Sequence, residues 1–246
     1  MTHNLDNLRT RLAAVRDAIQ AAAARHGRAI DAVTLLAVSK TQPARAIRAA
    51  AHAGQRRFGE NYLQEALAKM ADLADLDLEW HFIGPLQSNK TRPVAEHFAW
   101  VHSVDRLKLA ERLSAHRPEG LPLLNVCLQV NISAEASKSG CSLEELPALA
   151  RAVAALPRLR LRGLMAIPAP AEGLEAQRLP FRRLREAAER LNAEGLALDT
   201  LSMGMSDDLE AAIAEGATLV RVGSAIFGAR PAKPEHLPQR RGAAEQ

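Results

Sequence analysis

Short apolar runs alternate with longer amphipathic segments along most of this 246-residue chain. The apolar runs have the length and the Val, Ile and Leu content of buried strands, and they occupy residues 33–39, 57–60, 79–83, 100–104, 123–132, 159–167, 199–203 and 218–227. Segments with apolar residues at helical spacing separate them, at residues 44–53, 62–73, 106–116, 143–156, 181–192 and 208–215. Residues 89–98 also predict a helix, although Pro93 interrupts its start.

One further helix precedes the first predicted strand. Its apolar residues recur at spacings of three and four, which places them on one face of a helix: Leu5, Leu8, Leu12, Val15 and Ile19. Gly27 follows as the stop signal. We therefore expect an extra N-terminal helix ahead of the alternating units.

Eight strands joined by helical crossovers predict an α/β fold of the (β/α)8 TIM type. The competing architecture is an open doubly wound sheet, which usually carries a Gly-rich loop after its first strand. Here the first strand is followed by Ser39, Lys40, Thr41 and Gln42, and no glycine occurs before Gly54. We expect residues 1–230 to form a single barrel domain and residues 231–246 to be a disordered polar tail.

Composition and charge exclude several classes of function. The net charge is +4, but basic residues alternate with acidic ones, and aromatic residues, which would stack on bases, make up only 3% of the chain. No stretch has the apolar length of a membrane span, and the charged N-terminus does not resemble a signal peptide. Cys127 and Cys141 provide neither a disulfide scaffold nor a metal ligand set. We expect a cytoplasmic monomer with no metal site that binds neither nucleic acid nor membranes.

Lys40 is the first candidate for chemistry, because it ends a buried strand just ahead of a helix start. The partial positive charge of a helix N-terminus and the low exposure to water both lower the pKa of a lysine. A neutral lysine amine reacts with aldehydes and ketones to form a Schiff base. From this segment alone, a solvent-exposed lysine at a strand end remains the alternative.

Polar residues follow most of the other predicted strands, at the end where barrel enzymes have their active sites. Gly204 and Ser206 follow the seventh strand, and Gly223 and Ser224 follow a charged position in the eighth. Free amides at helix starts in these two loops often bind phosphate. The alternative is an ordinary helix cap, since residues 207–210 match a capping box that begins at Asp207.

Arg221 interrupts an apolar run in the eighth strand and would need an acceptor inside the barrel. A lysine facing a phosphate site implies a ligand that carries both an aldehyde and a phosphate. Pyridoxal 5′-phosphate and a phosphorylated sugar both meet this condition. The pyridine nitrogen of the former could accept from Arg221, whereas Glu60 is the alternative partner within the protein.

Several long segments carry a resemblance to a known family: LLAVSKTQP, RRFGENYLQEA, EWHFIGPLQSNK, VHSVD, LQVNIS with SKSG, LRGLMAIPAP and LSMGMSDDLEAAIAEGATLVRVGSAIFGAR. In these segments, from about residue 5 to residue 230, the chain resembles the pyridoxal phosphate homeostasis proteins. That family is similar to the N-terminal domain of alanine racemase, which is a barrel.

The resemblance implies a role for each candidate residue. Lys40 would form the internal aldimine with pyridoxal 5′-phosphate, and Arg221 would face the pyridine nitrogen. Asn61 would line the pocket near the ring. Three residues would hold the phosphate: Ser206, Gly223 and Ser224. Lys138 matches a second lysine suspected in cofactor handling, although a flexible loop lysine is an equally good interpretation.

Two functions of different classes follow from this resemblance. The first is intracellular homeostasis of the cofactor, in which the protein stores it and delivers it to apo-enzymes without turning over a substrate. The second is an amino acid racemase, which needs an acid/base group on each face of the substrate. The only tyrosine is Tyr62, and no β domain that would supply the second group is expected, so we favour homeostasis. A Schiff-base aldolase is a third reading, for which Glu60 and Asp105 would be the candidate carboxylates.

Overall fold

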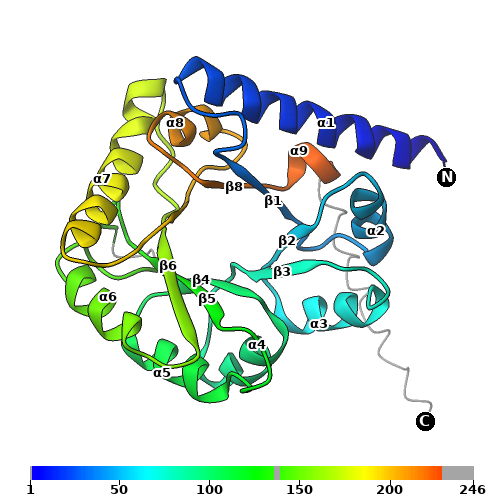
Figure 1. Ribbon diagram of the computed structural model, residues 1–246. Helices are drawn as coiled ribbons and strands as arrows, with labels where there is room; N and C mark the ends of the chain where they lie inside the picture. Colours follow the sequence, from blue (N-terminus) through cyan, green and yellow to red (C-terminus); the bar gives the residue numbers. More distant parts are fainter. Residues whose placement is uncertain (1, 136–138, 229–246) are drawn as a thin grey trace, which may run out of the picture.

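The computed structural model describes residues 2–135 and 139–228, with only the backbone described for residues 2–6. The predicted tail, 231–246, and Lys138 lie outside the described residues. Eight parallel strands form a closed barrel in sequence order (Figure 1). They are β1 (Thr34–Val38), β2 (Arg57–Glu60), β3 (Glu79–Phe82), β4 (Trp100–Val104), β5 (Leu124–Gln129), β6 (Leu159–Met165), β7 (Thr200–Ser202) and β8 (Leu219–Val222).

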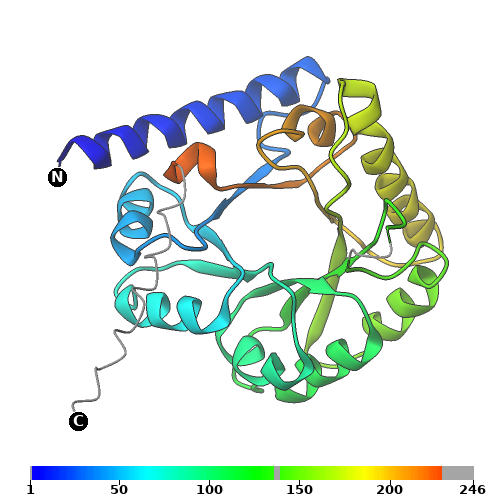
Figure 2. The same cartoon turned by 180° about the vertical axis from the view of Figure 1, so that it is seen from behind.

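Closure of the barrel is direct, because β1 pairs with β8 over four residues, from Thr34 opposite Leu219 to Ala37 opposite Val222. The predicted (β/α)8 barrel is therefore confirmed, and the open doubly wound sheet is wrong. The helices form a ring outside the strands (Figures 1 and 2). They are α2 (Ala44–His52), α3 (Leu63–Asp72), α4 (Thr91–His97), α5 (Leu107–His116), α6 (Leu146–Ala154), α7 (Leu174–Ala193), α8 (Leu209–Ala214) and α9 (Ser224–Phe227).

The predicted N-terminal helix is α1 (Thr2–Arg25), which ends just before Gly27 at φ 65°. It lies along the outside of the barrel beside α2, α8 and α9 (Figures 1 and 2). The helices α8 and α9 are short, so α1 covers the part of the barrel wall that they leave open. Four of the five predicted apolar positions are buried there: Leu8, Leu12, Val15 and Ile19.

Successive residues of each strand point alternately toward the helices and into the barrel. Phe58 and Phe82 face outward, and the Phe82 ring meets Phe98 edge-on at 5.3 Å. The opposite residues fill the interior, where Trp100, Cys127 and Met165 form a small apolar cluster of their own. Polar side chains share this interior with them, among them His81, which stacks on Trp100 at 5.3 Å. The space at the centre of Figure 1 is therefore occupied by side chains.

The predicted elements that differ from the structure include the eighth strand, the fifth strand and the helix α7. The eighth strand ends at Val222, and residues 224–227, predicted as strand, form α9 instead. Four apolar residues are too few to distinguish a helical from a strand period. The fifth strand ends at Gln129, three residues earlier than predicted. The helix α7 begins at Leu174, ahead of the predicted Phe181, because its first turns are exposed and have no apolar face.

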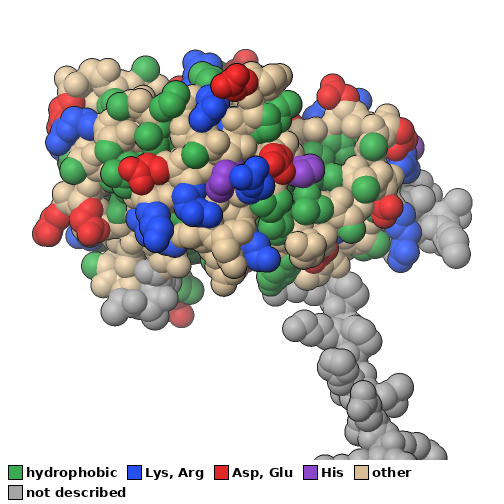
Figure 3. Space-filling model, turned by 90° about the horizontal axis from the view of Figure 1, so that it is seen from below, with side chains coloured by type: hydrophobic (Ala, Val, Ile, Leu, Met, Phe, Trp, Pro, Cys, Tyr) green, Lys and Arg blue, Asp and Glu red, His purple; other side chains and the backbone are tan. Residues whose placement is uncertain are grey.

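Charged side chains of both signs are interspersed on the face shown in Figure 3, and basic residues do not gather into one patch there. None of the described helices combines the length and the apolar composition that a membrane crossing requires. Within residues 2–135 and 139–228, no group of three or more His, Cys, Asp or Glu side chains is arranged to hold a metal ion.

The loop after β1 is held from outside the barrel by a buried group of charges, the Glu60 cluster (Ser39, Glu60, Glu65 and Lys69). Glu60 is fully buried and accepts from Ser39 Oγ at 2.6 Å and from Lys69 Nζ at 2.8 Å. Lys69 also donates to the carbonyl of Ser39 at 2.8 Å and contacts Glu65. Glu65 in turn accepts from the backbone N–H of Thr41 at 2.6 Å. The cluster thus contacts the chain on both sides of Lys40.

The position of Glu60 also decides whether it can be the alternative partner of Arg221. In β2, Gly59 faces the interior with Leu36, because a Cβ on Gly59 would meet the Leu36 side chain at 3.2 Å. Glu60, the next residue, therefore points outward. The alternative pairing of Glu60 with Arg221 is therefore wrong, and the partner of Glu60 is Lys69.

We expect Lys69→Met to destabilise the protein by about 3–5 kcal/mol, because it leaves the buried Glu60 carboxylate without a counter-charge. The double variant Glu60→Gln/Lys69→Met should recover most of this loss, since neither position then carries a charge. The measurement is the free energy of unfolding in urea. A Lys69→Met protein whose free energy of unfolding lies within about 1 kcal/mol of the wild-type value, the net contribution of one hydrogen bond, would contradict this account.

The same variant should show a defined pH dependence. Burial raises the pKa of Glu60, and Lys69 opposes that rise. Without Lys69 the pKa in the folded state rises further. A carboxyl with a raised pKa in the folded state favours folding at low pH, and this contribution is lost as the pH rises through the folded pKa. The stability deficit of Lys69→Met should therefore be small below pH 4.5, the ordinary value of the group, and should grow above it.

Candidate functional site

A pocket of about 320 Å³ opens at the carboxyl ends of β1, β2, β7 and β8. The six residues expected at the site all line it: Lys40, Asn61, Ser206, Arg221, Gly223 and Ser224. They come from segments up to 184 positions apart in the sequence (224 − 40), and closure of the barrel brings them together. The volume of this pocket lies at the lower end of the range for ligand pockets, about 300 to 1,000 Å³.

Lys40 lies in a tight turn in which the N–H of Gln42 donates to the carbonyl of Ser39 at 3.0 Å. Thr41 adopts φ 65° in this turn, a left-handed conformation that a β-branched residue rarely takes. Such strain persists only where the surroundings impose it, and here the Glu60 cluster does so by accepting from the N–H of Thr41. The turn places Lys40 two residues beyond Val38, which lines the same pocket.

Asn61 follows β2 and is packed against the loop after β3. A Cβ on Gly84 would lie 2.2 Å from the carbonyl oxygen of Asn61, so only glycine permits this approach. The side-chain oxygen of Asn61 is buried, and within the described residues no group donates a hydrogen bond to it. Buried polar atoms are rarely left without a partner. Because Asn61 lines the pocket, this oxygen is available to a ligand.

The loops after β7 and β8 build another part of the pocket. Gly204 has φ 94°, and a Cβ there would meet the Ala212 side chain at 2.5 Å, so the loop passes close to α8. Ser206 and Ser224 are exposed, and both line the pocket. The first amides of α8 and α9 also lack acceptors within their own helices. Hydroxyls and amides together suit an anion.

The helix cap expected at Asp207 is wrong. The residue that precedes α8 is Asp208, and its carboxylate accepts from the N–H of Met205 at 2.6 Å. It thereby holds the turn that presents Ser206. Burial raises the pKa of Asp208, against the effects of the Met205 hydrogen bond and of Arg221. Asp207 is exposed and lines the pocket.

Arg221 points into the barrel, where its side chain is 4% exposed. Its Nη1 donates to the carbonyl of Ser202 at 2.6 Å and to Ser202 Oγ at 2.8 Å. Its Nη2 donates to the carbonyl of Ala166 at 3.0 Å. Burial lowers the pKa of Arg221 to about 10, so the group is still protonated at neutral pH. The acceptors that this arginine requires are thus supplied largely by the backbone of the neighbouring strands.

Other residues of the site were not identified from the sequence. Gln42, Ile83, Ile167 and Met205 line the pocket, as does Asp207. The signal for Ile83 and Ile167 was present, since each ends a predicted strand at the same barrel face. Glu60 and Asp105, the carboxylates that an aldolase would need, are both absent from the lining. Tyr62 is 56% exposed and lines a neighbouring depression with Leu86 and Lys90 instead.

Comparison with known proteins agrees with this architecture. The family model described as "Alanine racemase, N-terminal domain" matches residues 4–231. A pyridoxal phosphate homeostasis protein of Pseudomonas aeruginosa is 68% identical over 225 residues, which cover 92% of this chain and 95% of the relative. A pyridoxal phosphate homeostasis protein of Escherichia coli K12 is 58% identical over 229 residues, which cover 92% of this chain and 98% of the relative.

A solved structure gives the same result. PipY of Synechococcus elongatus, determined with PLP bound, is 43% identical with a TM-score of 0.78, and the match covers 90% of this chain and all of PipY. The chain belongs to the alanine racemase N-terminal domain family and, within it, to the pyridoxal phosphate homeostasis proteins.

Proposed function

We propose that this protein binds pyridoxal 5′-phosphate in the pocket at the carboxyl ends of the strands, and that it stores and delivers the cofactor without turning over a substrate of its own. One observation carries the proposal: an amine, Lys40, and two exposed hydroxyls, Ser206 and Ser224, line the same small pocket. The relatives named for cofactor homeostasis and the PLP-bound PipY structure support the same ligand.

The residues present fit this group. The cofactor supplies an aldehyde that condenses with an amine, with loss of one water molecule, and an aromatic ring that can delocalise charge. Lys40 would provide the amine, and its strained turn would hold that amine at one place in the pocket. The buried oxygen of Asn61, which has no donor among the described residues, would accept from a hydroxyl of the ring.

The phosphate would be bound by Ser206, Gly223 and Ser224. Gly223 lies so close to β1 that a Cβ would be 3.1 Å from the carbonyl of Val38. Its lack of a side chain leaves the start of α9 open to the pocket. Two hydroxyls and the adjoining amides would donate to the phosphate oxygens, and hydrogen bonds to a charged acceptor are the strong ones.

Arg221 would face the ring nitrogen of the cofactor. The chemistry of a guanidinium group favours storage of the cofactor over catalysis. Guanidinium only donates and does not give up its proton at neutral pH, which agrees with its pKa of about 10. The ring nitrogen would therefore stay unprotonated and withdraw electrons weakly. Weak withdrawal disfavours removal of a proton from a bound amino acid, the step on which racemisation depends.

The racemase alternative also lacks its tyrosine at this site. Tyr62 lies outside the pocket, with 56% of its surface exposed. The alanine racemase of Corynebacterium glutamicum has a TM-score of 0.68 but is only 19% identical, and the match covers 94% of this chain and 64% of the racemase. At that identity the comparison supports a common fold and carries no argument about activity.

Lys40→Ala should abolish the visible absorption of the lysine-bound cofactor, because the amine that condenses with the aldehyde is gone. The matched control is Lys108→Ala, which removes an exposed lysine outside the pocket. The measurement is the absorption spectrum, followed by borohydride reduction and peptide mass analysis, which should place the label on Lys40. A Lys40→Ala protein with an unchanged spectrum, or a label on another lysine, would contradict the assignment.

Ser206→Ala should weaken cofactor binding by about 1.5–3 kcal/mol, the value of one hydrogen bond to a charged group. This corresponds to an increase in Kd of roughly tenfold to 150-fold. Ser88→Ala serves as the control, since Ser88 follows β3 and does not line the pocket. The Kd can be measured by fluorescence titration of the cofactor-free protein. An unchanged Kd would remove Ser206 from the phosphate site.

The storage and delivery function predicts no steady turnover of amino acids. Holo-protein should leave the chirality of L- and D-amino acids unchanged over hours. It should activate an apo-enzyme that depends on the same cofactor, at a rate that differs from the rate with free cofactor at matched concentration. Sustained racemisation of any amino acid would contradict the proposed storage and delivery function and would support the racemase alternative.

A further inference from the structure

A row of buried polar side chains crosses the barrel interior and ends at Arg221. Glu79 Oε1 lies 2.9 Å from His81 Nε2, and His81 Nδ1 lies 2.8 Å from His102 Nε2. His102 Nδ1 lies 2.8 Å from Ser202 Oγ, which accepts from Arg221 at 2.8 Å. We call Glu79, His81, His102 and Ser202 the histidine link.

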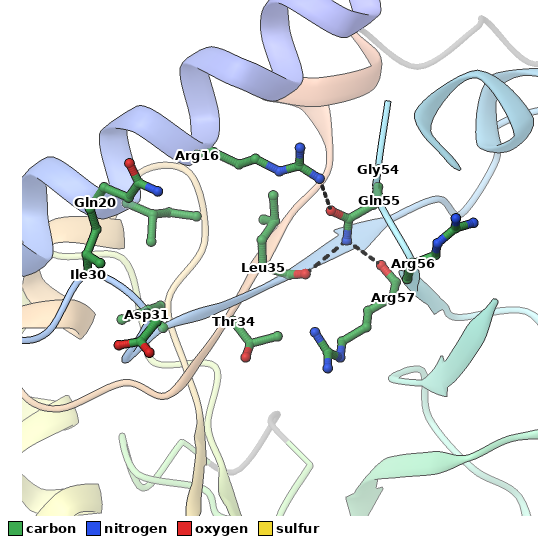
Figure 4. Close-up of a pocket in the computed structure, with 12 residues that line it drawn as sticks. Arg16, Gln20, Ile30, Asp31, Thr34, Leu35, Gly54, Gln55, Arg56 and Arg57 are labelled. Carbon is green, nitrogen blue, oxygen red and sulfur yellow. Dashed lines mark hydrogen bonds between the residues drawn. The ribbon is translucent and has the colours of Figure 1, made fainter. Parts of the chain in front are cut away.

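The two ends of the histidine link differ in their exposure to water. Glu79 begins β3 at the amino-terminal face of the barrel, where its side chain is 38% exposed and pairs with Arg57 at 3.0 Å. Arg57 lines a pocket of about 400 Å³ between α1 and the starts of β1 and β2 (Figure 4). His81, His102 and Ser202 are fully buried. The histidine link therefore joins an open depression on one face to the cofactor pocket on the other.

The direction of every hydrogen bond in the histidine link follows from its two ends. The Glu79 carboxylate can only accept, so His81 Nε2 carries a proton and donates. Neutral His81 then accepts at Nδ1, which requires His102 to donate from Nε2 and to accept at Nδ1. Ser202 must consequently donate its hydroxyl proton to His102, which leaves its oxygen lone pairs for Arg221.

Neutral histidines are what this environment favours. Burial lowers the pKa of His81, although Glu79 opposes that effect. Burial, His81 and Arg221 together hold the pKa of His102 well below its ordinary value. The aromatic packing also keeps both rings in place, since His81 stacks on Trp100 and lies 5.1 Å from His102.

We propose that the histidine link is a positioning device for Arg221, in which the carboxylate of Glu79 selects the histidine tautomers that orient Ser202 to accept from the guanidinium. If the hydrogen bonds ran in the opposite direction, His102 would donate to Ser202. The Ser202 oxygen would then accept from both His102 and Arg221, and its own proton would need another acceptor. Glu79 thus acts on Arg221 across the barrel without contacting the pocket. The consequence for the cofactor rests on the function proposed above.

The first experiment needs no cofactor. Long-range proton–nitrogen NMR of the imidazole rings in the cofactor-free wild-type protein should show His81 and His102 as neutral Nε2–H tautomers at pH 7. Single His81→Gln and His102→Gln spectra assign the signals. Finding either ring charged, or protonated on Nδ1, would overturn the proposal whatever ligand the pocket binds.

The second experiment tests the effect across the barrel. Glu79→Ala should remove the tautomer preference of His102, raise the cofactor Kd about fivefold, as for the loss of one net hydrogen bond, and shift the absorption maximum of the bound cofactor. Glu79→Gln keeps an acceptor oxygen and should restore wild-type tautomers, affinity and absorption. Asp75→Ala, which removes an arginine–carboxylate pair remote from the histidine link, is the control and should change none of these.

A structural role alone would move the melting temperature but not the tautomers or the absorption maximum. If Glu79→Ala is folded and leaves the His102 tautomer, the Kd and the spectrum unchanged, the proposal is wrong. It is equally wrong if Asp75→Ala reproduces the effects of Glu79→Ala. Failure of the wild-type protein to bind the cofactor would instead refute the proposed function, while the NMR result would still decide on the histidine link.

Discussion

A guanidinium ion buried inside a parallel barrel is the constraint on which the site depends. Arg221 is fully enclosed, and an unpaired charge in such a place would cost several kcal/mol. The barrel meets this demand with the carbonyls of Ser202 and Ala166 and with the Ser202 hydroxyl. These acceptors come from the ends of β6 and β7, where Met165 lies opposite Ser202. The guanidinium therefore ties the register of three strands to the geometry of the pocket.

The second basic residue of the pocket, Lys40, is positioned by a different set of contacts. Lys40 is partly buried at the end of β1, and its turn is set by the Glu60 cluster, which lies between the strands and α3. Charges on the outer face of one strand thus position an amine on the inner face of the neighbouring strand. Because the two devices act from opposite sides of the barrel wall, a change in one need not disturb the other.

Much of this arrangement could be predicted from the sequence, and the exceptions have physical reasons. Alternating periods predicted the eight strands, and barrel topology alone placed Lys40, Ser206 and Arg221 at one face. The partners of Arg221 could not be predicted, because two of them are backbone carbonyls, which carry no sequence signal. His81 and His102 stood within recognisable segments, but their contact depends on the register between β3 and β4.

The errors have the same origin. Glu60 was considered as the alternative partner of Arg221 inside the barrel, but the alternation of side chains along β2 places it on the outer face, where it pairs with Lys69. The four residues of α9 were expected to continue β8, because a short apolar run fits both periods. Local pattern determines which residues are buried more reliably than it determines which side of a strand they occupy.

The proposed storage function rests on the chemistry of the pocket. A strong electron sink needs a protonated ring nitrogen, and hence an acid close to it. The group here is a cation that keeps its own proton and is held in place by neutral acceptors. The histidine link contributes no acid either, because burial keeps both rings neutral and its one carboxylate lies at the far face. These features underlie the proposal that the protein stores the cofactor and does not use its ring in a reaction.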